Sequence, residues 1–373
     1  MKCILRVFTW LFVVAVVSLA AAHQASAFDV FEVKDVEVDI TAKNADAARN
    51  QAVTDGELIA FRRLLKRMTL HMDWDKLPEL GPDGIRTIIR DFSVTQEKTS
   101  SVRYIGKLSF RFKSKEVRAL LTSYGIQYTQ TPSKPVLILP VYQVAGSYLL
   151  WDEPNPWRAA WSDRPVIDGL VPTVLPLGDL SDIAAIGSEQ AVIGDVERLS
   201  AIASRYGAND ALVGLAVLEG EAGSGFQELK VRINRYGGNV EYPRVDASYV
   251  LQLDETEADL LKRAAFDLTL QIEDTWKQAN LISSSEKGVL VVSVPVAGLG
   301  DWIGVRKALK DVAIVQKAEI ALMSRKEVRV KLHYTGTAGQ LAVALEQVNL
   351  TLIQDADVWI LAKSGNVASK QIP

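Results

Sequence analysis

Three tryptophans and an arginine lie close together in the stretch WDEPNPWRAAW, residues 151–161. A short helix opening at its Asn-Pro pair would place Trp157 and Trp161 on one face, because they are four residues apart. With Trp151 and Arg158, they have the composition of a partner-binding hot spot or of a platform that stacks on sugar rings. The favoured alternative is a small satellite core, since large aromatic side chains are mostly buried. Trp151, nearest the preceding strand, is then expected to be the most buried.

Closely spaced carboxylates are the other candidate reactive groups, because a hydrolase needs a general acid and a base. Asp152 and Glu153 are adjacent, and neighbouring side chains of an extended chain point in opposite directions. Asp179 and Asp182 are better spaced, but the sequence Leu-Gly-Asp-Leu-Ser-Asp is typical of a turn followed by a helix cap. Structural roles are therefore favoured over catalysis for both pairs.

Histidines and glycines show no pattern typical of a cofactor site. His71 and His333 are far apart in the sequence, and neither has a second histidine at metal-ligand spacing. The sequence contains no Gly-x-Ser-x-Gly elbow, phosphate loop or dinucleotide fingerprint. The glycines from Gly220 to Gly225 are interpreted as a hairpin turn. We expect no catalytic residue, no metal and no cofactor.

The first residues have the pattern of a cleavable signal peptide. Lys2 and Arg6 precede an apolar run, and Ala25 and Ala27 supply the small residues of a cleavage site. The run is shorter than the roughly 20 residues of a good spanning helix, so cleavage is favoured over an uncleaved anchor. We expect residues 1–27 to be removed, leaving a periplasmic protein without a transmembrane anchor.

Cysteine usage and charge exclude several classes of protein. Cys3, the one cysteine, lies in the predicted signal, which excludes disulfides and cysteine nucleophiles from the mature chain. The full chain has 42 basic and 45 acidic side chains and a net charge of −3. It shows neither the basic stripe of a nucleic-acid binder nor a polybasic cluster for anionic lipid.

Hydrophobic periodicity predicts a first α+β domain over residues 28–130. The alternation in 30–40 indicates a half-buried strand, and 47–68 has the spacing of a long helix with small residues at its start. A short helix, two strands and a final helix at 114–124 complete the order strand, helix, short helix, strand, strand, helix.

Two further domains are predicted over residues 135–280 and 287–373. The central one opens with a strand buried on both faces, 136–144, and contains a long irregular stretch from 151 to 194. The last has the order β-α-β-β-α-β of a split βαβ sandwich, although its final stretch could form one strand or more. Pro- and Ser-rich stretches are interpreted as linkers. The fold class is therefore α+β: three small sheet-plus-helix domains in series, with helices on one face of each sheet.

These residues resemble a family of uncharacterised proteobacterial periplasmic proteins, a domain of unknown function. The likeness covers most of the mature chain and is carried by an opening strand and alanine-bearing helix, a tryptophan segment and a Leu-Gly-Asp turn: residues 33–65, 155–161 and 177–179. Residues 28–130 also look like the N-terminal domain of a flagellar outer-membrane ring protein. Residues 136–140 and 206–214 look like periplasmic assembly domains of the Tol and curli systems.

The resemblance implies no established activity, and likeness of fold is weak support for function. Together with the missing catalytic motifs, it predicts a non-catalytic periplasmic protein that binds or assembles another cell-envelope protein. The alternatives are an envelope polysaccharide-binding module that uses the tryptophan segment, and a hydrolase that uses Asp179 or Asp182.

Overall fold

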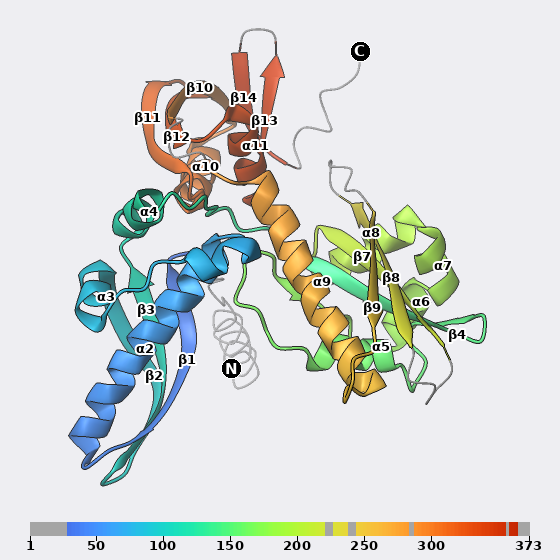
Figure 1. The fold of residues 1–373 in the computed structure, drawn as a ribbon. Coiled ribbons are helices and arrows are strands. Elements are labelled where there is room, and N and C mark those ends of the chain that lie inside the picture. Colours follow the sequence, from blue (N-terminus) through green and yellow to red (C-terminus); the bar gives the residue numbers. More distant parts are fainter. Residues whose placement is uncertain (1–27, 221–226, 238–243, 283–286, 356–357, 365–373) are drawn as a thin grey trace, which may run out of the picture.

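The computed structural model describes residues 28–220, 227–237, 244–282, 287–355 and 358–364, which form three sheets with flanking helices (Figure 1). The predicted α+β class is confirmed. The predicted signal peptide, most of the glycine-rich turn and the core of the serine-rich linker lie outside these residues. Within them, no helix combines the length and the apolar character needed to cross a bilayer.

The first domain is an antiparallel sheet of order β1-β3-β2, crossed by a long helix. The helix packs closely because Ala48 and Ala52 are fully buried, and because a Cβ on Gly56 would lie 2.9 Å from Leu108. Asn44 caps its start. The elements are β1 (Glu32–Thr41), α2 (Ala45–Met68), η1 (His71–Lys76), α3 (Pro82–Ile88), β2 (Ile89–Thr99), β3 (Arg103–Phe112) and α4 (Ser114–Ser123).

The central domain has a sheet of order β5-β4-β7-β8-β9, with the short β6 pairing to β4. The strands are β4 (Val136–Val144), β5 (Ser147–Leu149), β6 (Thr173–Val174), β7 (Asp210–Glu219), β8 (Glu228–Gly237) and β9 (Val245–Val250). The helices are α5 (Pro156–Asp163), α6 (Leu180–Ala185), α7 (Ser188–Ile193), α8 (Val196–Arg205) and α9 (Glu257–Ala279).

Helices cover both faces of this sheet, so the prediction of helices on one face is wrong for the central domain. Leu137 and Leu139 belong to an apolar cluster with Leu199 of α8, whereas Val136 and Ile138 belong to the cluster that includes α5 and α9. The cause is the parallel pairing of β4 with β7, which requires a long crossover connection. That connection carries α5 to one face and α8 to the other.

The third domain differs from the predicted β-α-β-β-α-β order by one added strand. Its sheet has the order β11-β12-β10-β14-β13, and β14 lies parallel to β10. The stretch predicted as one strand or more forms a hairpin, and its second strand takes the place beside β10. The elements are β10 (Lys287–Pro295), α10 (Leu299–Asp311), β11 (Val315–Met323), β12 (Glu327–Thr335), α11 (Ala338–Gln347), β13 (Leu350–Asp355) and β14 (Val358–Lys363).

The first predicted linker, residues 131–135, overlaps a largely buried segment, residues 129–134, on which all three domains meet and which we call the buried strap. Gln130 is fully buried, and its side chain donates to the carbonyl of Ala313 at 3.1 Å. Trp276 of α9 donates to the carbonyl of Thr131 at 2.8 Å. The linker prediction used only Pro and Ser content, which does not reveal that the backbone groups have partners in distant domains.

The third domain is expected to fold without the other two. It closes its own sheet over α10 and α11, and Val292, Leu309 and Leu345 are among its buried side chains. Residues 284–373 expressed alone should therefore unfold in one cooperative thermal transition, followed by circular dichroism. A broad, non-cooperative melt would contradict this and show that the domain depends on the strap.

Candidate binding site

The tryptophan segment packs beneath the central sheet. Asn155 caps α5 as expected, and the helix carries Trp157 and Trp161, whose side chains are 0% and 1% exposed. The indole N–H of Trp157 donates to the carbonyl of Gly214 at 2.9 Å, and the two rings meet edge to face at 5.7 Å. The packing alternative therefore describes both residues, which have no free face to offer a sugar or a partner.

Trp151 and Arg158 lie at the rim of the same domain. Trp151 is only partly buried, so the expectation that it is the most buried of the three is wrong. Trp151 follows β5, a strand at one edge of the sheet, whereas α5 carries Trp157 and Trp161 under the sheet. Arg158 lies over the Trp151 ring at 5.5 Å and donates to the carbonyls of Pro176 and Leu177. Its guanidinium holds the following loop in place.

Asp179 and Asp182 hold α6 against α8. Asp179 caps α6, as its sequence predicted, and pairs with Arg205. Asp182 is fully buried, and its carboxylate accepts hydrogen bonds from the Gly178 amide at 2.8 Å and the Tyr206 hydroxyl at 2.5 Å. Burial and the bond to this carboxylate raise the pKa of Tyr206. Both carboxylates are thus engaged in structural contacts, and these two residues do not form a free acid–base pair.

The remaining predicted polar residues are not brought together. Asp152, Glu153 and His71 are exposed, and His333 pairs with Glu319 at 3.2 Å. Over the described part of the chain, no group of three or more histidines and carboxylates could hold a metal ion.

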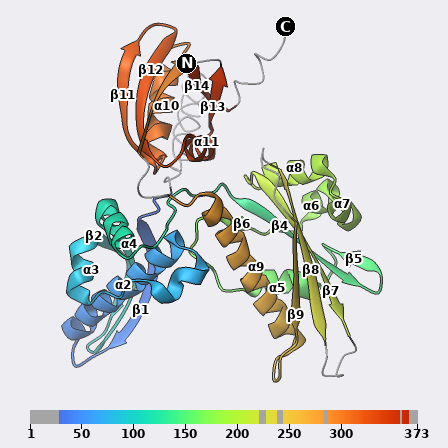
Figure 2. The same ribbon diagram turned by 45° about the horizontal axis from the view of Figure 1, so that its top comes forward.

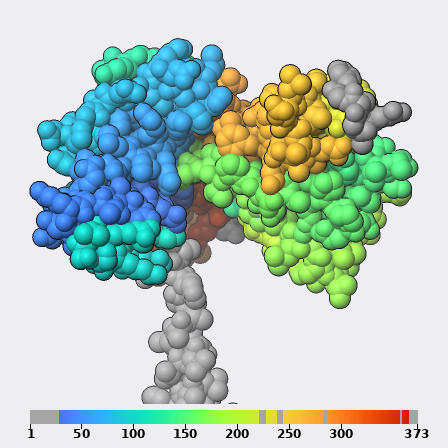
Figure 3. All heavy atoms as spheres, turned by 60° about the horizontal axis from the view of Figure 1, so that its bottom comes forward, coloured from blue at the N-terminus to red at the C-terminus, as the bar shows by residue number. Residues whose placement is uncertain are grey.

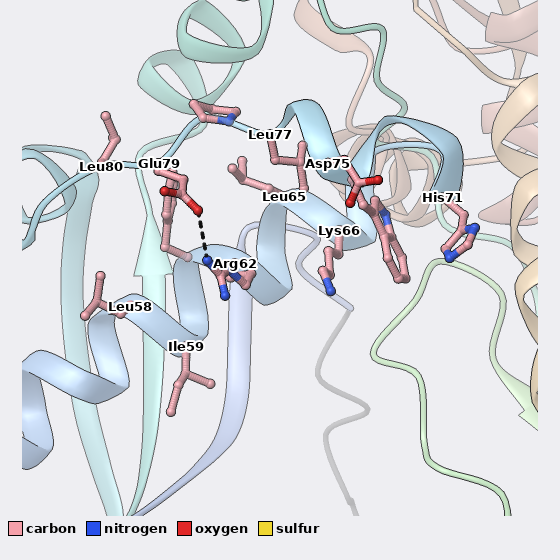
Figure 4. A pocket seen from close by; sticks show the side chains of 13 residues that line it. Leu58, Ile59, Arg62, Leu65, Lys66, His71, Asp75, Leu77, Glu79 and Leu80 are labelled. Carbon is pink, nitrogen blue, oxygen red and sulfur yellow. Dashed lines mark hydrogen bonds and ion pairs between the residues drawn. The ribbon is translucent and has the colours of Figure 1, made fainter.

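A groove of about 770 Å³ lies on the first domain, between α2 and the segment that folds back after it (Figure 4). Along α2, Leu58 and Ile59 are each 38% exposed, although both are large aliphatic residues in the middle of a packed helix. The groove is lined by Leu58, Ile59, Phe61, Arg62, Leu65, Lys66, His71, Trp74, Asp75, Leu77, Pro78, Glu79 and Leu80.

An ion pair joins the two walls of the groove. Arg62 of α2 pairs with Glu79 at 3.4 Å, and these side chains are 67% and 86% exposed. Such an exposed pair contributes at most about 1 kcal/mol, so an occupant can displace it. Lys66 lies 4.4 Å from the centre of the Trp74 ring. The Trp74 indole N–H is shielded from solvent and has no hydrogen-bond partner among the described residues.

The groove was not predicted from the sequence, although one signal pointed to it. The helical spacing of Phe61, Leu64, Leu65 and Met68 predicts a core stripe along this helix, and all four are buried. Leu58 lies outside that stripe and had no assigned partner. The segment that forms the opposite wall has no clear period, so its fold-back over α2 could not be derived.

The first and central domains lie side by side (Figure 3), and buried charged side chains hold them together. Arg67 of α2 is 2% exposed and pairs with Asp168. Within the central domain, Glu273 of α9 is equally buried and accepts hydrogen bonds from the amides of Leu170 and Val171, which anchors α9 beside the contact. Helix α9 thus lies between the two domains (Figure 2).

Lys277, one turn further along α9, completes this contact. Its ammonium donates to the carbonyls of Lys66 and Thr69 at 3.0 and 2.9 Å and lies 3.7 Å from Glu273. Burial lowers the pKa of Lys277, and the nearby carboxylates of Glu273 and Asp274 oppose that shift. The end of α2 is therefore held in a set orientation toward the central domain, and with it the end of the groove.

No protein-family model matches the chain, and no match is found among curated proteins. The basis for a functional proposal is therefore the geometry of the chain itself.

Proposed function

We propose that the protein is a non-catalytic binding protein of the cell envelope, which holds a segment of another envelope protein in the groove of its first domain. The observation that carries this proposal is the groove itself. Exposed aliphatic side chains, a tryptophan and both signs of charge line it, and apolar contacts with a polar rim are what protein interfaces use. Export by a signal peptide cleaved after Ala27 is part of the proposal.

The other two predicted functions have less support from the geometry. A polysaccharide module needs an exposed aromatic platform, and Trp157 and Trp161 are buried. A hydrolase needs available carboxylates, and Asp179 and Asp182 are engaged as a helix cap and a buried hydrogen-bond acceptor. Neither the buried tryptophans nor the engaged carboxylates affect binding in the groove, because that binding depends on the shape and apolar surface of the groove.

Site-specific cross-linking in the envelope tests the groove. A photo-reactive residue at position 58 should give a recurring adduct with one envelope protein, identified by mass spectrometry. The matched control is position 102, because Val102 is also aliphatic, 42% exposed and in the first domain, but outside the groove. The same adducts from both positions would contradict the proposal.

Leu58→Asp is then expected to weaken binding of that purified protein by at least about tenfold, which is 1.4 kcal/mol. A charge placed among the aliphatic residues of the groove must be desolvated when the occupant binds. Stability should change little, because Leu58 is partly exposed, and surface changes are usually within about 0.5 kcal/mol. Val102→Asp should bind like the parent in the same titration. Equal binding by the two variants would remove the groove as the site.

A further inference from the structure

The sheet of the third domain has an open edge beside an uncovered apolar surface. β11 lies at one edge of the sheet and, among the described strands, pairs with β12 alone. Ile320 and Met323 are 49% and 51% exposed, whereas their cross-strand partners Val330 and Val328 are 0% and 1% exposed. Directly opposed residues share one face of a sheet, so the helix layer covers β12 on this face and stops short of β11.

A hollow of about 320 Å³ lies between α10 and this strand. Trp302 and Leu309 of α10 form part of its lining and are only 4% and 3% exposed, so they present a firm apolar wall. The charged side chains that line it are Arg306 and Lys310, four residues apart on one face of α10. Among the described residues no carboxylate lines it, so the electrostatic preference of the hollow is for an acidic occupant.

The register of β11 sets the length of backbone that can pair. The strand is regular from Lys317 to Ile320, and irregularities lie between Val315 and Lys317 and between Ile320 and Leu322. Irregularities of this kind end or redirect pairing. A short extended segment therefore fits the edge better than a long strand does.

We infer that β11 binds an acidic, extended segment of another protein, which adds as a strand to the Lys317–Ile320 edge. Main-chain hydrogen bonds to the edge give such a segment affinity, and side-chain pockets give it specificity. An apolar side chain enters the hollow against Trp302. Residues i and i+2 of a strand share one face, so a carboxylate two positions away reaches Arg306 or Lys310.

Three labelled peptides test this inference on the full mature chain by fluorescence anisotropy. The first has leucine and glutamate two residues apart in a threonine–valine background. The second has lysine in place of glutamate, and the third is the acidic peptide with N-methyl groups on alternate backbone amides. We expect the acidic peptide to bind at least about tenfold more tightly than either of the others, because each loses one of the two required contacts.

Charge reversal provides the decisive variant. Arg306→Glu/Lys310→Glu should reverse the preference, so that the lysine peptide binds more tightly than the glutamate peptide. The matched control is Lys307→Glu/Lys326→Glu, because both lysines are exposed in the same domain but do not line the hollow; it should keep the parent's preference. Leu58→Asp should bind the acidic peptide normally, which separates this site from the groove. Failure of the acidic peptide to bind, equal binding of all three peptides, or an equal effect of the control variant would overturn the inference.

Discussion

Replacing Trp157 by alanine is expected to lower the free energy of unfolding of the central domain by about 3–5 kcal/mol. The side chain is fully buried, and its indole N–H satisfies the carbonyl of Gly214 on β7. The substitution therefore leaves a cavity under the sheet and removes a buried hydrogen bond. Trp161→Ala should cost a similar amount, because that ring is 1% exposed and packs edge to face on the first.

Tryptophan fluorescence during denaturant unfolding measures this loss. Val166→Ala is the surface control, since Val166 is 97% exposed and in the same domain; it should unfold within about 0.5 kcal/mol of the parent. Arg158→Ala should lower the free energy of unfolding less than either tryptophan variant does, because the Arg158 side chain only holds a loop at the rim of the domain. A Trp157→Ala protein that unfolds like the parent yet no longer binds its partner would restore the tryptophan segment as a recognition surface.

Replacing Glu273 by alanine is expected to lower the free energy of unfolding by about 3–5 kcal/mol. The substitution breaks a buried charge pair and leaves the other partner unpaired. The amides of Leu170 and Val171 lose their acceptor. The ammonium of Lys277, whose pKa burial already lowers, loses its nearest carboxylate. The first and central domains should then separate before either unfolds.

Limited proteolysis and thermal melting together test this second result. Glu273→Ala should be cut within the strap at protease levels that leave the parent intact, and its melt should split into two transitions. Asp274→Ala is the control on the same helix: Asp274 contacts the first domain directly, through the amide of His71, at a partly exposed position, whereas Glu273 acts through Lys277, which bonds the carbonyls of Lys66 and Thr69. The free energy of unfolding of Asp274→Ala should fall by at most about 1 kcal/mol. An Asp274→Ala protein as sensitive as Glu273→Ala would show that the buried charge is not what joins the domains.

Much of the fold could be predicted from the sequence because its periods are strong and local. The helical spacing of Leu260, Leu261, Ala264 and Leu268 predicts one buried face of α9, and these residues are buried; the capping-box sequence at Thr337 predicts a helix start, and α11 begins there. In these elements the residue spacing, the cap and the core contact all favour one structure, which is the condition for a reliable prediction.

The errors share a different cause: each concerns contacts between residues far apart in the chain. The crossover that places helices on both faces of the central sheet depends on β4 pairing with β7, and no local period encodes that pairing. The same holds for the site. Aromatic composition pointed to Trp157 and Trp161, but composition alone does not distinguish a buried anchor from an exposed one. The groove beside Leu58 depends on a fold-back of residues without periodicity.

The buried strap also constrains how the chain reaches its folded state during synthesis. The N-terminal domain emerges from the ribosome first and holds one partner of the strap, because Met68 accepts from the Thr129 amide, but other partners come much later. Trp276 follows Thr131 by 145 residues, Ala313 follows Gln130 by 183, and Gln347 follows Lys134 by 213. Contacts this distant add loop-closure entropy that local pairs avoid. The contacts of Gln130 and Lys134 with the third domain therefore form only after residues 313 and 347 have been added, later than the strap's contacts with Met68 and Leu170.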